Sequence, residues 1–214
     1  MSLQSLPLAQ RLALSYAPAT SREDALTLLI LDARLAAVVH IGGEAMIAQI
    51  KLAWWRERLA EEPAKWPKGE PLLERLRQGE IDPAGLVPLV DGWEHLLVEE
   101  ASPEAIEVVA SARGVAWALL CDDPAKLEAV RQAGRQWALA DLALAFPELA
   151  ATISHAGLLE NAKTALPRSL RPLSVLRALA MRAVRRNAGD LLDGPGAMAL
   201  ALRVGLLGAN LLMY

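Results

Sequence analysis

The chain has 214 residues, of which 54% are hydrophobic and 22% are charged, with a formal net charge of −3. High hydrophobicity with a low net charge excludes an intrinsically disordered chain, and it gives no global basic field for a nucleic-acid partner. A single cysteine, Cys121, excludes an intrachain disulfide, and with only three histidines the chain has no Cys/His zinc motif.

The first predicted helices follow an N-terminal segment without a targeting pattern. Residues 1–11 hold no basic region followed by an apolar run, so we expect no signal peptide and a cytoplasmic protein. A helix is predicted from Ser21 to about His40, because Ser21-Arg22-Glu23-Asp24 resembles a capping box. Gly42-Gly43 ends this helix. A second helix is predicted over 44–61, where apolar residues recur at helical spacing.

Three later helices are marked by a capping residue followed by proline. Asp82-Pro83, Ser102-Pro103 and Asp123-Pro124 each place an N-cap side chain before Pro at the first helical position. We expect these helices to run to about Glu100, Leu120 and Phe146. Further helices are predicted over 72–78, 172–187 and 197–213. Leu and Ala dominate throughout and no Gly-rich phosphate loop follows a strand pattern, so the sequence predicts a single all-α domain over 1–214.

The last predicted helix is apolar enough to raise the question of a membrane span. Between Ala197 and Tyr214 the only charged residue is Arg203, and a run of about 18 apolar residues is the length of a span. Arg203 stands near its middle, where a charge is costly in lipid, and Asn210 adds a second polar group. We therefore expect a buried core helix instead of a span.

One segment is distinctive by itself. Residues 46–63 read MIAQIKLAWWRERLAEEP, which resembles the squalene/phytoene synthase family, in particular its bacterial and mitochondrial branch with adjacent tryptophans. The stretches 11–36, 86–120, 133–148 and 165–180 resemble further helices of that family in the same order. The resemblance implies an isoprenoid (terpenoid) synthase-like helical bundle around a central cavity. Active members join two prenyl diphosphates head to head, with Mg²⁺ held by two aspartate-rich motifs.

The residues at the family's metal motifs differ from the family pattern. The first motif, D-D-x-x-D, falls on Ala36-Ala37-Val38-Val39-His40, and the metal-facing Asp of the second motif falls on Ala145, with Asp141 nearby. Because Mg²⁺ prefers oxygen ligands, we expect a chain that has lost Mg-dependent condensation and needs no cofactor. The alternative is an active head-to-head prenyltransferase acting on farnesyl or geranylgeranyl diphosphate, which would need Mg²⁺.

The resemblance also suggests what a non-catalytic member would do. The same branch includes an assembly factor for mitochondrial respiratory complex I, which implies either a role in assembling respiratory-complex subunits or the binding of an isoprenoid such as a quinone tail. A structural dimerisation module is a third possibility. The candidate cavity and ligand-binding residues are His40, Lys51, Trp54, Trp55, Arg56 and Asp141. For each of them core packing, a solvated face or helix capping is the alternative.

The most basic region lies near the C-terminus. Residues 163–186 contain seven Lys and Arg side chains and no Asp or Glu. Arg182, Arg185 and Arg186 fall within about 100° of helical arc. The pattern predicts an amphipathic basic helix, which is either a solvated face or a contact with an acidic partner or with anionic lipid at the inner face of a membrane.

Overall fold

The computed structural model describes residues 3–40, 45–97, 102–145 and 165–208, and these form helices and short 3-10 turns without a strand, which confirms the all-α prediction. The α-helices are α1 (Leu8–Ser15), α2 (Ala19–His40), α3 (Ala45–Ala60), α4 (Pro71–Gln78), α5 (Val87–Glu94), α6 (Pro103–Ala118), α7 (Leu127–Ala145), α9 (Arg171–Arg186) and α10 (Ala197–Leu207).

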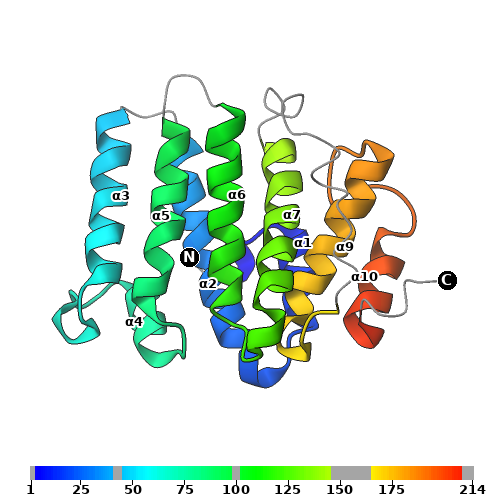
Figure 1. Ribbon diagram of the computed structural model, residues 1–214, viewed down its shortest axis with the longest axis horizontal. Helices are drawn as coiled ribbons and strands as arrows, with labels where there is room; N and C mark the ends of the chain where they lie inside the picture. The colour runs from blue at the N-terminus through cyan, green and yellow to red at the C-terminus, as the bar shows by residue number, and fades with distance from the viewer. Residues whose placement is uncertain (1–2, 41–44, 98–101, 146–164, 209–214) are drawn as a thin grey trace.

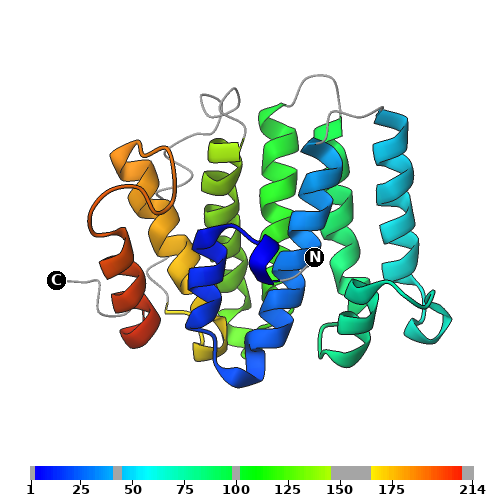
Figure 2. The same ribbon diagram turned by 180° about the vertical axis from the view of Figure 1, so that it is seen from behind.

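The helices form two layers. On one face α3, α5, α6, α7, α9 and α10 stand side by side in that order (Figure 1). On the other face α2 covers α3, α5 and α6, and α1 covers α9 (Figure 2). Consequently α3 and α10 lie at opposite ends of the molecule, and each has one side without a described helix against it.

The predicted helix starts at Asp82, Ser102 and Asp123 are confirmed. Each side chain accepts a hydrogen bond from a backbone N–H two or three residues further on, at 3.0 to 3.1 Å. After Asp82 and Asp123 a 3-10 turn precedes the α-helix. α5 ends at Glu94, earlier than predicted, and a 3-10 turn follows it. The predicted ends at Glu100 and Phe146 lie outside the described residues.

The start predicted at Ser21 is wrong. α2 begins two residues earlier, at Ala19, so Ser21 lies inside the helix. Its hydroxyl donates to the carbonyl of Ser169, at 2.8 Å, and ties α2 to the turn before α9. The sequence analysis also missed α1. α1 follows Pro7 and has no side-chain cap at its start, so it lacks the capping signal that marks several of the other helices.

The core is built around α6 and α7. Trp93, Trp117 and Trp137 are fully buried there, and the last two meet edge to face with ring centres 6.1 Å apart. Gly114 and Gly134 let the two helices approach closely. A Cβ on Gly134 would lie 2.8 Å from the Cα of Gly114, and a Cβ on Gly114 would overlap the carbonyl oxygen of Arg131.

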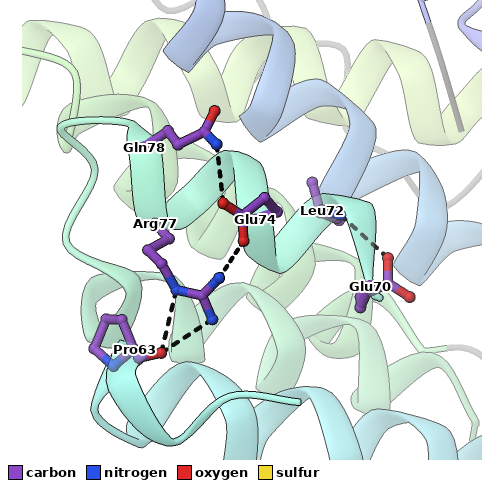
Figure 3. Close-up of polar contacts among 6 residues, drawn as sticks. All are labelled: Pro63, Glu70, Leu72, Glu74, Arg77 and Gln78. Carbon is purple, nitrogen blue, oxygen red and sulfur yellow. Dashed lines mark hydrogen bonds and ion pairs between the residues drawn. The ribbon is translucent and has the colours of Figure 1, made fainter. Parts of the chain in front are cut away.

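The short helix α4 is held by side-chain contacts at both ends (Figure 3). Glu70 accepts from the backbone N–H of Leu72, at 3.2 Å, and caps its start. Towards its end, Arg77 pairs with Glu74 and donates to the carbonyl of Pro63 at 3.1 and 3.3 Å. Glu70, at the start of α4, also accepts a hydrogen bond from Arg34 on α2.

The last helix is only partly the core helix that the sequence predicts. Ala201 and Val204 are fully buried against the bundle. Large apolar side chains on its outer side are exposed, because α10 is the end helix of its layer. Among the described residues, none of the helices has the length and apolar character required to cross a membrane. Residues 209–213 of the predicted helix lie outside the described part of the chain.

Candidate functional site

A pocket of about 550 Å³ lies between α2 and α3, at one end of the molecule. Its described lining is mostly apolar: Arg34, Ala37, Val38, Ile47, Ala48, Ile50, Lys51, Trp54, Trp55 and Glu70. The volume lies within the range of about 300 to 1,000 Å³ that is typical of small-molecule sites. The resemblance implied a central cavity, whereas this pocket opens at the edge of the bundle.

Both adjacent tryptophans line the pocket. Trp55 is 4% exposed and anchors α3 in the core, whereas Trp54 is half-buried. Their rings meet edge to face with centres 4.9 Å apart, and the guanidinium of Arg34 lies 5.8 Å from the ring centre of Trp55. The sequence analysis gave core packing and pocket lining as alternatives for these two tryptophans. In the structure both line the pocket, and Trp55 is also part of the core.

The polar groups of the pocket differ in their pairing. Arg34 donates to both carboxylate oxygens of Glu70, at 2.8 and 3.0 Å, so these two charges offset each other. Lys51 is exposed, and the structure gives its ammonium group no partner among the described residues. As far as the structure describes the chain, the pocket therefore offers an apolar wall with one available cation, Lys51, on its rim.

Arg56, predicted with Lys51 as a ligand-binding cation, does not line the pocket. It pairs with Asp91, at 2.6 Å, and with Glu94 on α5. The hydrogen bond that it donates to Asp91, and then the one that it donates to Glu94, raise the pKa of its guanidinium. Arg56 therefore joins α3 to α5. The side chain of His40 lies outside the described residues.

Asp141 belongs to an ion cluster between α2, α6 and α7 that the sequence analysis missed. Arg113 is only 4% exposed and donates to Asp141 at 2.8 Å and to Asp32 at 2.7 Å. Asp32 also accepts from the indole N–H of Trp93, at 2.8 Å. Burial alone lowers the pKa of Arg113, but the charges and hydrogen bonds of the two carboxylates more than offset it and raise that pKa.

The cluster fills the centre of the described bundle. The Arg113 guanidinium lies between two indoles, 5.0 Å from the ring centre of Trp93 and 4.9 Å from that of Trp137. The space beside it amounts to about 10 Å³, roughly one water. In the sequence, Asp32 and Arg113 each stand within a mostly apolar run. Because charged side chains are rarely buried without a partner, this pattern was the signal that could have indicated a buried ion cluster.

The residues aligned with the family's metal motifs lie apart. Ala37 and Val38 line the pocket at α2, whereas Ala145 is exposed at the end of α7. Among the described residues, no group of three or more His, Cys, Asp and Glu side chains is placed to hold a metal ion. At the pocket, the methyl group of Ala37 occupies a position that the resemblance assigns to a carboxylate.

The predicted basic helix corresponds to α9, and its arginines have different roles. Arg182 donates to the carbonyls of Asp193 and Pro195, at 2.6 and 2.8 Å, and so holds the connection to α10. Arg177 donates to Gln136, at 2.7 Å, and burial lowers its pKa. Arg185 and Arg186 are exposed at the helix end. The predicted three-arginine face thus leaves two residues directed to solvent.

Comparison with known proteins gave no assignment: no family model, no curated protein and no solved structure matches this chain. The function is therefore argued from the pocket and from the residues that surround it.

Proposed function

We propose that this chain is an isoprenoid synthase-like protein that binds an isoprenoid, or a molecule with an isoprenoid tail, in the pocket between α2 and α3. The observation that carries the proposal is the pocket lining. It combines the double-tryptophan segment with the aliphatic residues of α2 that stand in place of the first metal motif. An apolar chain fits such a lining, and an anionic head group fits Lys51.

The exposed aliphatic residues at the pocket support an apolar ligand. Ile47 and Ile50 line it and are 47% and 63% exposed, and the neighbouring Met46 is 69% exposed. Contiguous exposed apolar surface on a protein commonly marks a binding site. A hydrocarbon chain lying along α3 would remove this surface from water, which stabilises the complex by about 25 cal/mol for each Å² buried.

The same lining argues against condensation of prenyl diphosphates. Mg²⁺ and the leaving diphosphate need several carboxylate oxygens, because the metal stabilises the charge that develops as the allylic bond breaks. The described lining holds one carboxylate, Glu70, and it is paired with Arg34. We therefore propose binding without turnover.

The test compares two probes, farnesol and farnesyl diphosphate, by calorimetric titration in the presence of EDTA. We expect both to bind, and the diphosphate to bind more tightly. Lys51→Gln should weaken the affinity for the diphosphate about twofold to fivefold, as expected for the loss of an exposed ion pair. The affinity for farnesol should not change.

Two matched variants locate the binding. Ala37→Phe fills the pocket and should abolish binding of both probes. Ala60→Phe places the same side chain at the exposed far end of α3 and should leave binding intact. Absence of binding to the wild-type chain, or equal binding by the Ala37→Phe variant, contradicts the proposal.

Assembly of a membrane complex such as respiratory complex I is a second candidate function. The observation that favours it is the exposed apolar side of α10, described below, at the end of the molecule opposite the pocket. Affinity purification of the full chain from membranes solubilised in mild detergent should recover respiratory subunits if this function holds. Recovery of a bound isoprenoid without such subunits favours the first function alone.

A further inference from the structure

The outer side of α10 carries an apolar stripe along its whole length. Met198, Leu202 and Leu206 recur every four residues and are 58%, 52% and 65% exposed, with Leu207 beside them at 55%. At 1.5 Å per residue, the stripe from Met198 to Leu206 is about 12 Å long. The opposite side of the same helix packs against α9 and α1, so the stripe is held as a ridge at the end of the molecule.

Arginine dominates the charge around this ridge. α9 and α10 together contain six arginines and no Asp or Glu, and Arg185, Arg186 and Arg203 are exposed. The acidic side chains nearby in sequence, Asp190 and Asp193, lie in the connection between the two helices. Asp190 accepts from the backbone N–H of Leu192, at 2.7 Å, and thereby shapes that turn. Within the described residues, the apolar ridge of α10 thus belongs to a helix pair, α9 and α10, whose charged side chains are all arginines.

We infer that α10 docks on the surface of an anionic lipid bilayer, with the Met198, Leu202 and Leu206 stripe inserted among the acyl chains and the arginines at the head groups. An amphipathic helix that binds in this way needs an exposed apolar face flanked by cations, and this helix pair supplies both. The inference is independent of the proposed isoprenoid binding, because that pocket lies against α3, at the other end of the molecule from α10.

Charge complementarity and size select this occupant over a second copy of the chain. Two copies packed through the stripe would bring two arginine-rich helix pairs together, and like charges across an interface repel. A stable protein interface takes about 20 to 30 residues from each partner, far more than the four side chains of the ridge. A bilayer accepts a narrow convex ridge and supplies the anionic charge.

The first experiment reports the depth of the helix directly. In a Cys121→Ser background, Ala199→Cys on α10 and Ala60→Cys on α3 each carry an environment-sensitive NBD fluorophore. Both positions are exposed, and the helices that carry them, α10 and α3, lie at opposite ends of the molecule (Figure 1). With vesicles of phosphatidylglycerol and phosphatidylcholine, we expect a blue shift and increased emission at position 199 and no change at position 60. No change at 199, or equal changes at both positions, overturns the inference.

The second experiment measures vesicle affinity by co-sedimentation of unlabelled variants. Leu202→Ser with Leu206→Ser should weaken binding at least about tenfold, given the apolar surface lost. Leu8→Ser with Val108→Ser removes two exposed apolar side chains from α1 and α6, outside both the stripe and the pocket, and should have no effect. Far-UV circular dichroism confirms that both variants fold. Equal binding by the α10 variant and wild type contradicts the inference.

The cationic contribution has its own signature. Arg185→Gln with Arg186→Gln should weaken binding about fivefold per charge at low salt, and the difference should vanish near 1 M salt, where the screening length is about 3 Å. Vesicles of phosphatidylcholine alone should bind the wild-type chain less tightly. Capture of an acidic protein on α10 without binding to any anionic vesicle overturns the lipid assignment in favour of a protein partner.

Discussion

At the scale of single residues, the buried ion cluster is the most demanding feature of the molecule. Arg113, Asp32 and Asp141 come from three helices, and the first two are each 4% exposed. A buried charge is tolerated only when it is paired and hydrogen-bonded, and here the indole of Trp93 completes the partners of Asp32. The cluster therefore holds α2, α6 and α7 in one relative position.

Arg113→Met tests this structural role. The change keeps the length and apolar stem of the side chain but leaves two carboxylates without their cation, so the free energy of unfolding should fall by about 3 to 5 kcal/mol. Arg131→Met is the matched control. Arg131 is 50% exposed and lies 3.8 Å from Glu128, so its loss should cost less than about 1 kcal/mol. Urea unfolding measures both, and equal effects would contradict a special role for Arg113.

Residue-level features were predictable from the sequence where they depend on neighbours along one helix. Lys51, Trp54 and Trp55 lie within five residues on α3, and the structure brings all three to one pocket. The partners of Arg113 were not predictable in this way, since Asp32 is 81 residues away in the chain. Arg56 was misplaced for the same reason, because its partner Asp91 belongs to another helix.

At the scale of elements, the start of a helix was easier to predict from the local sequence than the contacts between helices. The caps at Asp82, Ser102 and Asp123 were predictable, because each bond joins residues at most three apart. Ser21 was misplaced because its hydroxyl bonds a residue 148 positions away instead of its own helix. The close approach of α6 and α7 at Gly114 was likewise invisible in the sequence alone.

Gly114→Ala tests that approach. The added methyl group would meet the backbone of Arg131 on α7, which can yield only if the helices separate, so the free energy of unfolding should fall by about 1 to 3 kcal/mol. Gly189→Ala is the matched control, because a Cβ there has no atom within 4 Å. Its effect should stay within about 0.5 kcal/mol. Thermal or urea unfolding measures both changes in the free energy of unfolding. If Gly114→Ala leaves this free energy unchanged, the helices are not in tight contact at this position.

At the scale of the whole molecule, the filled centre and the open edge fit the binding function that we propose. Trp93, Trp137 and Arg113 occupy the space between the helices where the resemblance implies a cavity. The accessible volume lies at one end, against α2 and α3, and the exposed apolar ridge of α10 lies at the other. A carrier or assembly protein can use two separate surfaces of this kind.

The absence of turnover is a prediction of this arrangement. The purified chain, incubated with Mg²⁺ and farnesyl or geranylgeranyl diphosphate, should release no pyrophosphate above the protein-free background. An active head-to-head synthase assayed in parallel provides the positive control. Pyrophosphate release together with a head-to-head hydrocarbon product would refute the non-catalytic account and support the active prenyltransferase in its place.

The most direct test of the central claim is mass spectrometry of the organic extract from the purified wild-type chain and the Ala37→Phe and Ala60→Phe variants, with thermal unfolding confirming that each is folded. The account predicts an isoprenoid or isoprenoid-tailed lipid in the wild-type and Ala60→Phe extracts in equal amounts, and none in the Ala37→Phe extract. A wild-type extract without any isoprenoid, or the same amount from all three chains, would contradict it.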